Sequence, residues 1–301
     1  MTCHNNNVPT IACIGGAHLD HRGLLRAPVV LGTSNPGSVQ VDLGGVARNV
    51  AQNLAHLGCQ VLLCSRVGND EAGRQVLAQP IDTSLVTVSD CRPTASYTAI
   101  LEPNGELVVG LADMEIYDEV TPDILTPIVP RLRQAGLWFI DTNFPSDTIG
   151  WLLAQAEVPV SVDAISVAKS RRLLPLLPRI HYLFCNVAQA GALAGTTFID
   201  PGEAAEGLVR LGAPSGVVSA GPRGIAVYDR AAISVMPAIP ATPRDVTGAG
   251  DALVAGTLYG LSHHLDLCAA SRLGLAAAAI TVESESSAAP FLSLEALHAR
   301  A

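Results

Sequence analysis

One stretch late in the chain has the residue types to bind an anion and move a proton. Residues 245–251 read Asp-Val-Thr-Gly-Ala-Gly-Asp and lead into an apolar run. A helix that starts after small residues points free backbone N–H groups and the positive end of its dipole at one spot. An aspartate there fits a general base that takes a proton from a hydroxyl attacking a phosphoryl group. The alternative is that Asp251 simply caps the helix.

Two polar side chains near the N-terminus could hold a hydroxyl-rich ligand. Asp20 follows a short apolar run and Gly15-Gly16, and Asn49 follows Gly44-Gly45 at a helix start. A carboxylate accepts hydrogen bonds from two neighbouring hydroxyls, whereas an amide both donates and accepts. Taken separately, Asp20 also fits a turn cap, and Asn49 also fits an ordinary residue of a helix N-terminus.

Composition excludes several classes of function. The chain has 301 residues, a formal net charge of −9 and no Lys/Arg run, so we expect no binding to nucleic acid or to an anionic membrane. Its single lysine, Lys169, does not follow a glycine-rich loop, which excludes a phosphate-loop lysine. Backbone N–H groups, arginine or a metal ion would have to meet a phosphate. No G-x-G-x-x-G follows the first strand, so a dinucleotide oxidoreductase is not expected.

Cysteine usage and hydropathy predict a cytoplasmic protein. Seven cysteines occur without a Cys-x-x-Cys pair, which is typical of reduced thiols in the cytosol. The N-terminal residues are polar and lack the apolar region of a signal peptide. The alanine-rich run at 268–282 is interrupted by Arg272, so we predict a buried helix there rather than a membrane span.

Strands and helices alternate along most of the chain. The pattern predicts right-handed crossovers and a parallel sheet with helices on both faces. Strands are expected at residues 9–14, 59–67, 136–141, 158–162, 182–185, 216–219 and 225–227, and helices at 44–57, from 70, at 147–156 and 203–211, and twice after residue 248. Residues 21–43 and 92–116 instead have turn signals and hairpin character. We therefore predict one domain over residues 1–301, with a small β lid formed by these two insertions.

Taken together, the three motifs resemble the ribokinase-like (PfkB) family of carbohydrate and nucleoside kinases. The resemblance covers essentially the whole chain, and Asp-x-Thr-Gly-Ala-Gly-Asp at 245–251 is its most specific part. It implies a three-layer αβα fold with a mainly parallel central sheet and a β lid. Within the family, residues 33–37 and 44–55, Ala112-Asp113-Met114 and Val162-Asp163-x-x-Ser166 look like the pseudouridine kinase branch.

The resemblance also implies a role for each site residue. Asp251 would be the general base, and Gly248, Ala249 and Gly250 would form the anion hole. The nucleoside would be bound by Asp20, Ser34, Asn35, Gly45, Asn49, Asp113, Met114 and Asn143. ATP would lie against Asn186, Gln189, Ser219, Gly221 and Gly224. Mg²⁺ would accompany ATP, and Asp245 and Thr247 would bind a monovalent cation such as K⁺. The lid would pair with a second copy in a homodimer.

Two residues depart from the family pattern. Gln189 replaces the usual glutamate of Asn-x-x-Glu, so we expect weaker organisation of Mg²⁺. His18 stands where the family often has asparagine beside the sugar. His18 and His21 lack an evident third ligand, and we expect both to be solvated rather than metal-bound.

Three functions remain open on the sequence alone. The first is ATP-dependent phosphorylation of a nucleoside 5′-hydroxyl, with pseudouridine as substrate. The second is the same chemistry on another nucleoside or a pentose. The third, suggested by Gln189, is a nucleoside-binding regulatory protein with weakened kinase chemistry.

Overall fold

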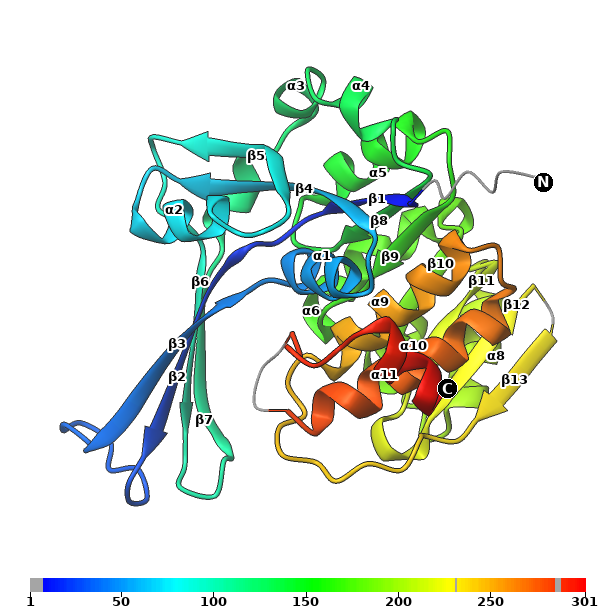
Figure 1. The fold of residues 1–301 in the computed structure, drawn as a ribbon. Helices are drawn as coiled ribbons and strands as arrows, with labels where there is room; N and C mark the ends of the chain where they lie inside the picture. Colours follow the sequence, from blue (N-terminus) through cyan, green and yellow to red (C-terminus); the bar gives the residue numbers. More distant parts are fainter. Residues whose placement is uncertain (1–7, 231, 285–287) are drawn as a thin grey trace.

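The computed structural model describes residues 8–230, 232–284 and 288–301, and these form two sheets (Figure 1). The larger sheet has nine strands. In spatial order they are β13 (Ala232–Met236), β12 (Ile225–Asp229), β11 (Ser215–Ser219), β10 (Tyr182–Asn186), β9 (Val160–Asp163), β8 (Leu137–Asp141), β1 (Thr10–Ile14), β4 (Gln60–Gly68) and β5 (Asp82–Ser89). All neighbours pair in parallel except β11–β12 and β12–β13.

Helices cover both faces of this sheet. One face carries α1 (Val46–His56), α2 (Glu71–Leu77), α9 (Ala249–Ser262), α10 (Leu267–Val282) and α11 (Leu294–Arg300). The other carries η1 (Glu115–Glu119), α3 (Pro122–Leu125), α4 (Val129–Leu132), α5 (Ser146–Gln155), η2 (Arg171–Arg179), α7 (Val187–Ala194) and α8 (Pro201–Arg210). The short α6 (Val167–Ser170) and η3 (Gly221–Arg223) lie in loops after β9 and β11.

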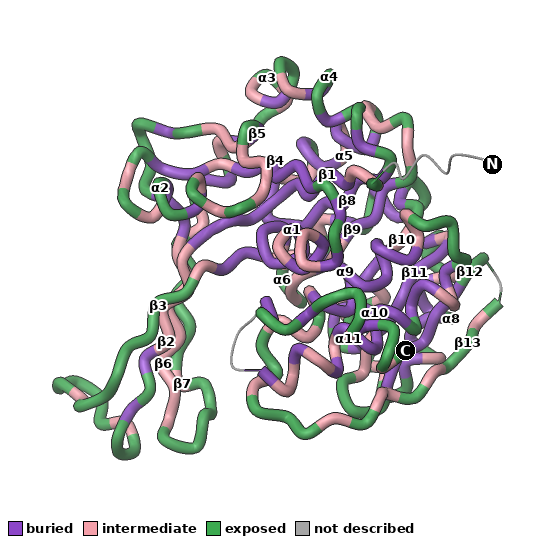
Figure 2. Tube along the Cα trace, in the orientation of Figure 1, coloured by how far each residue is buried: buried purple, intermediate pink, exposed green. Residues whose placement is uncertain are grey.

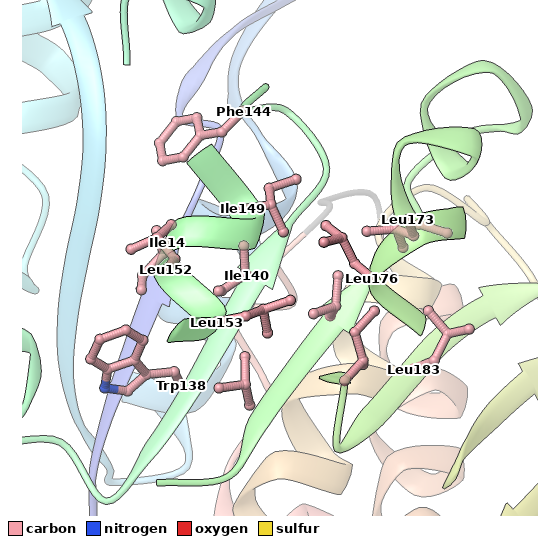
Figure 3. Packing of buried hydrophobic residues seen from close by; sticks show 14 of the residues in the cluster. Ile14, Trp138, Ile140, Phe144, Ile149, Leu152, Leu153, Leu173, Leu176 and Leu183 are labelled. Atoms are coloured by element: carbon pink, nitrogen blue, oxygen red, sulfur yellow. The ribbon is translucent and has the colours of Figure 1, made fainter. Parts of the chain in front are cut away.

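Alternation along the central strands supplies two apolar cores. In β1, Ile11 and Cys13 face the core under α1 and α9, whereas Ala12 and Ile14 face the core under α5. The second of these packs Trp138 and Ile140 of β8 against α5 and η2 (Figure 3). Because both faces of each strand are buried, these strands read as continuous apolar runs.

The four-stranded sheet projects from the larger body as a lid (Figure 1). Its order is β3 (Gly37–Gly44), β2 (His18–Leu25), β6 (Ser96–Leu101) and β7 (Leu107–Asp113). The lid is largely exposed, in contrast to the buried strands of the central sheet (Figure 2).

The two faces of the lid differ in chemistry. Residues directly opposed on neighbouring strands point to the same face. Val39 and Val109 belong to one such row, and Val41 and Leu111 to the next. These four side chains are between 52% and 70% exposed and define an apolar face. Asp20 and Arg22 alternate with these rows along β2 and therefore lie on the opposite face, which we call the site face.

The expected fold class, three-layer αβα with a mainly parallel sheet and a β lid, is confirmed. The edge strands β5 and β13 and the terminal helix α11 were not anticipated, and the 215–236 end of the sheet is antiparallel rather than parallel. Within the described ranges, no helix has the length and apolar character needed to cross a membrane. The six cysteines in those ranges are free, whereas Cys3 and the rest of the polar N-terminal segment, residues 1–7, lie outside them.

Candidate active site

A hydrogen bond between two helix N-termini forms the centre of the site. Asn49, in the first turn of α1, donates from Nδ2 to Oδ2 of Asp251, in the first turn of α9, over 2.7 Å. The two residues are 202 positions apart in the chain. The structure thus brings together Asn49 and Asp251, two residues that the sequence singled out independently.

The N-terminus of α9 has the geometry expected of an anion site. Gly248 is the N-cap residue, in the left-handed conformation at φ 78°, and no side chain caps the helix. No side chain therefore uses the first-turn N–H groups at 249–251, although that of Ala249 donates to the carbonyl oxygen of Val246 over 3.3 Å. A Cβ built on Gly250 would meet nothing within 4 Å, so the space in front of this turn is open. The alternative interpretation of Asp251 as the helix cap is wrong.

The carboxyl of Asp251 is held partly away from solvent. Burial raises its pKa to about 8, and the carboxylates of Asp163 and Asp141 act in the same direction. The hydrogen bond from Asn49 and the charge of Arg48 oppose this rise. A carboxyl with a pKa near neutrality can both accept and release a proton at physiological pH.

Each glycine of the Gly44-Gly45 pair permits a different close approach. A Cβ on Gly44 would lie 2.1 Å from Oδ2 of Asp20, so glycine at 44 leaves room for that carboxylate. A Cβ on Gly45, at φ 96°, would lie 2.3 Å from the carbonyl oxygen of Gly16. The pair therefore lets α1 start directly against the turn after β1 and beside Asp20.

Arg48 was not anticipated from the sequence, yet its charge lies close enough to Asp251 and Asp20 to interact with both. It is 4% exposed and donates to Oδ1 of Asn49 and to the carbonyl oxygen of Leu43. Burial lowers its pKa to about 10, while Asp251 and Asp20 act to raise it. Because Asn49 accepts from Arg48 through Oδ1, its Nδ2 donor is left to face Asp251.

His18 is buried rather than solvated, which corrects our expectation for this residue. It is 8% exposed, with Nε2 3.3 Å from Oδ1 of Asp20 and Nδ1 3.2 Å from the hydroxyl of Tyr117. Tyr117 in turn donates to the carbonyl oxygen of Ala17. His18 thus contacts the carboxylate of Asp20 from inside the protein. Within the described residues, no group of three or more metal-ligating side chains occurs.

Carboxylates at the ends of β8 and β9 lie behind the site. Asp141 is fully buried and accepts from the backbone N–H groups of Gly16, Ala47 and Asn143. Burial raises the pKa of Asp163 to about 7, and Asp141 adds to that rise. The position of both at the carboxyl ends of parallel strands was the signal that could have identified them.

Lys169, the single lysine, also lies in this region. Its Nζ is 2.5 Å from Oδ1 of Asn143, and burial lowers its pKa. Asn143 is itself 4% exposed. Lys169 therefore lies beside Asn143, a predicted substrate-binding residue. No sequence motif indicated this position near the site.

Two adjoining hollows are lined by most of the expected ATP-side residues, and the first of them also lies beside Asp251. One, of about 170 Å³, is lined by Asp251, Gly250, Asp163, Asn186, Gln189 and Ser219, among others. The other, of about 480 Å³, shares Asn186 and Ser219 and adds Gly221. Gly224 lines neither hollow. Gly224 has a φ of 88°, and a Cβ at this position would lie 2.0 Å from the carbonyl oxygen of Met236.

Gln189 takes part in helix capping. Its Oε1 accepts from the N–H of Asn186 over 2.8 Å, and its own N–H donates to Oδ1 of Asn186 over 2.9 Å. The two form a capping box at the start of α7. Glutamate at this position could make the same bonds, so the neutral amide changes the charge beside the hollow without changing the cap.

Four expected substrate residues lie on the lid, apart from the Asn49–Asp251 centre. Ser34 and Asn35 belong to the loop between β2 and β3 at the far end of the lid (Figure 1). The side chain of Asn35 bonds back to Val30 and Thr33 in its own loop. Asp113 ends β7 and Met114 follows it, at the end of the lid nearest the body.

An arginine binds the side chains of the two residues expected at a monovalent-cation site. Arg22 of β2 donates from Nη1 to Oδ2 of Asp245 and from Nη2 to Oγ1 of Thr247, each over 2.8 Å. Asp245 also accepts the N–H of Thr247 through Oδ1. These side-chain oxygens therefore already have a cationic partner, and they do not fit a second cation.

Comparisons with known proteins show the family of the chain. Residues 9–293 match the family described as pfkB family carbohydrate kinase. The chain is 34% identical to pseudouridine kinase of Escherichia coli over 82% of each protein, and 26% identical to guanosine-inosine kinase of Exiguobacterium acetylicum over 91% of this chain and 94% of the other. A solved carbohydrate kinase from Agrobacterium tumefaciens shares 35% identity with a TM-score of 0.83, over 97% of both chains. The chain therefore belongs to the PfkB family of carbohydrate kinases, which transfer a phosphoryl group to a hydroxyl.

Proposed function

We propose that the protein transfers the γ-phosphoryl group of ATP to the 5′-hydroxyl of a nucleoside, with pseudouridine as the substrate. The observation that carries the proposal is Asp251, hydrogen-bonded to Asn49 at the uncapped N-terminus of α9. The similarity to pseudouridine kinase of Escherichia coli supports this choice of substrate.

In the proposed reaction, Asp251 accepts the proton of the 5′-hydroxyl. The freed oxygen attacks the γ-phosphorus, the bond to the β,γ-bridging oxygen breaks, and ADP leaves. The N–H groups of Gly248, Ala249 and Gly250 stabilise the negative charge that develops on the transferred group. The proton ends on Asp251. Its raised pKa favours the protonated carboxyl after the phosphoryl group has been transferred.

The sugar would be held by Asp20, Gly45 and Asn49. After bonding Arg48 and Asp251, the amide of Asn49 still has one N–H and one oxygen lone pair for a ribose hydroxyl. Such fixing places the attacking oxygen in line with the phosphorus, which is most of what phosphoryl transfer requires of a protein. Asn143, beside Gly16, would add a contact from the end of β8.

The base would be contacted from the lid. Asp113 and Met114 lie at the end of the lid nearest the site, whereas Ser34 and Asn35 would reach the base only after the lid rearranges. A contact of the Asn35 side chain with the base would replace its bonds to Val30 and Thr33.

ATP would occupy the hollows beside Asp251, against Asn186, Gln189, Ser219 and Gly221, with Gly224 shaping the loop. Mg²⁺ prefers oxygen ligands, and Asp163, Asn186 and Gln189 line the same hollow. Oδ1 of Asn186 and Oε1 of Gln189 each accept one N–H in the capping box and keep a second lone pair, so these residues would hold the ion. When bound with ATP, Mg²⁺ neutralises charge on the phosphates. The neutral Gln189 weakens its hold.

We also propose a homodimer formed through the lid. Val39 and Val41 of β3 and Val109 and Leu111 of β7 are exposed on the face opposite Asp20, and a second copy would cover them. We further propose that residues 1–301 work as one kinase domain in the cytoplasm. A monomeric mass in sedimentation at micromolar concentration would contradict the dimer.

An ADP-release assay with pseudouridine, uridine, adenosine, inosine and ribose tests the function, with Asp251→Asn as the control. We expect turnover with pseudouridine to exceed turnover with every other acceptor. A preference for inosine would favour the activity of the relative from Exiguobacterium acetylicum. Nucleoside binding without ADP release would support the regulatory-protein alternative. Full activity of Asp251→Asn would contradict the general-base role.

A further inference from the structure

An ion-pair cluster joins the lid to the loop that precedes α9. Arg22 lies on the site face of β2, two residues after Asp20 on the same strand. Its guanidinium bonds Asp245 and Thr247 with two N–H···O contacts of 2.8 Å. The planar fork of arginine can fix two acceptors at once, whereas a lysine ammonium acts as a point charge.

The loop that Arg22 contacts leads directly into the proposed anion hole. Thr247 precedes Gly248, the N-cap residue of α9. On its other side, the loop is anchored by the N–H groups of Arg244 and Asp245, which donate to the carbonyl oxygen of Val282. Arg22 is thus the side chain that ties the middle of this loop to the strand carrying Asp20.

Electrostatics supports a stable contact. Burial acts to raise the pKa of Asp245, but hydrogen bonds from Arg22 and Thr247 outweigh it and hold that pKa below its usual value. The side chains of Arg22 and Asp245 are 39% and 19% exposed, so this pair is only partly screened by solvent. A monovalent cation at Asp245 and Thr247 would have to displace the guanidinium or tolerate its repulsion.

We propose that Arg22 is a positioning residue that couples the lid to the anion hole. Its guanidinium supplies the positive charge that the family resemblance assigns to a monovalent cation. This inference rests on the proposed kinase function. When Asp20 holds the sugar, Arg22 on the same strand holds the loop at 245–248. One strand, β2, therefore positions both the sugar-binding carboxylate and the loop that carries the phosphoryl-binding amides.

The first test measures hydrogen exchange in the protein without substrate. Hydrogen exchange of the amides at 246–250 is compared among the wild type, Arg22→Ala, Arg22→Lys and Arg26→Ala, where Arg26 is the exposed arginine that follows β2. We expect exchange about three- to tenfold faster in Arg22→Ala, a smaller rise in Arg22→Lys and none in Arg26→Ala. Unchanged exchange in Arg22→Ala, with circular dichroism showing a folded protein, would overturn the proposal.

The second test uses turnover. We expect Arg22→Ala to lower kcat about 10- to 100-fold with a smaller change in the KM for ATP. Low guanidinium chloride should restore part of this loss and leave the wild type unaffected. The wild type should work equally well with K⁺ or tetramethylammonium as the only monovalent cation. Strong activation of the wild type by K⁺ would refute the charge-replacement part.

These two readouts separate the inference from the proposed function. If the wild type phosphorylates no nucleoside, the function fails, yet hydrogen exchange still decides whether Arg22 orders the loop. If the wild type is active and Arg22→Ala matches it in both rate and exchange, the inference fails and the function stands.

Discussion

Replacing Asn49 with leucine should shift the pH at which the protein becomes active. Asn49 donates to Asp251 over 2.7 Å, and that bond holds the pKa of Asp251 down against burial. A hydrogen bond to a charged group contributes about 1.5–3 kcal/mol, and one pKa unit corresponds to about 1.4 kcal/mol. Loss of the bond should therefore raise the pKa by about 1–2 units above the value of about 8.

The assay is kcat/KM for the nucleoside as a function of pH, because this ratio reports ionisation of the free protein. Activity requires the deprotonated carboxylate, so kcat/KM should rise with pH through the pKa of Asp251. In Asn49→Leu this rise should move to higher pH. At pH 7 the loss from ionisation alone should be about 10- to 100-fold. The loss that remains at high pH measures the missing sugar contact.

Asn53 supplies a matched control on the same helix. It is fully buried one turn after Asn49, and neither polar atom of its side chain has a hydrogen-bond partner among the described residues. Asn53→Leu should leave the pH profile unchanged and should not destabilise the fold. A rise that stays within about half a pH unit of the wild type in Asn49→Leu would refute the reasoning about Asp251.

Four other substitutions have defined outcomes. Asp251→Asn should lower kcat about 10²–10⁴-fold. Because the fold raises the pKa of Asp251 to about 8, its ionisation opposes folding, so the wild type should lose stability between about pH 4 and pH 8; urea unfolding of Asp251→Asn should lack that part of the loss. Gly250→Ala adds a methyl that meets nothing within 4 Å, so thermal unfolding should show equal or higher stability, while turnover assays should show slower phosphoryl transfer. Gly44→Ala puts a Cβ 2.1 Å from Oδ2 of Asp20 and should raise the nucleoside KM about 10- to 100-fold; an unchanged KM would contradict this. Gln189→Glu should change turnover or its Mg²⁺ dependence in a metal titration; if neither changed, the metal-side assignment would be wrong.

The parts of the site that sequence could predict are those with local signals. Gly248–Asp251 combines small residues with a following apolar helix, and this pattern alone indicates an anion site. The central strands are buried on both faces and read as apolar runs, which made the parallel sheet predictable. The edge strands β5 and β13 are less buried, and their apolar pattern is too weak to indicate a strand.

The unpredicted parts depend on contacts between distant segments. Arg22 and Asp245 are 223 positions apart, and no local pattern connects a lid arginine with the loop before α9. Arg48 stands at a helix start, where an arginine is usually solvated, and only the packed structure shows that Leu43 and Asn49 bind it. The local sequence around Lys169 excludes a phosphate loop, but it gives no sign that the fold brings Lys169 to Asn143.

The two-residue alternation of the lid limits how its length can change during evolution. Asp20 and Arg22 share one face of β2, and the exposed Val39 and Val41 of β3 share the other face. Inserting or deleting one residue within either strand would exchange the faces beyond that point. A change in β2 before Arg22 would turn Arg22 away from Asp245, and a change in β3 before Val39 would turn the two valines to the site face. Length changes within these strands should therefore come in pairs or be absorbed by a bulge.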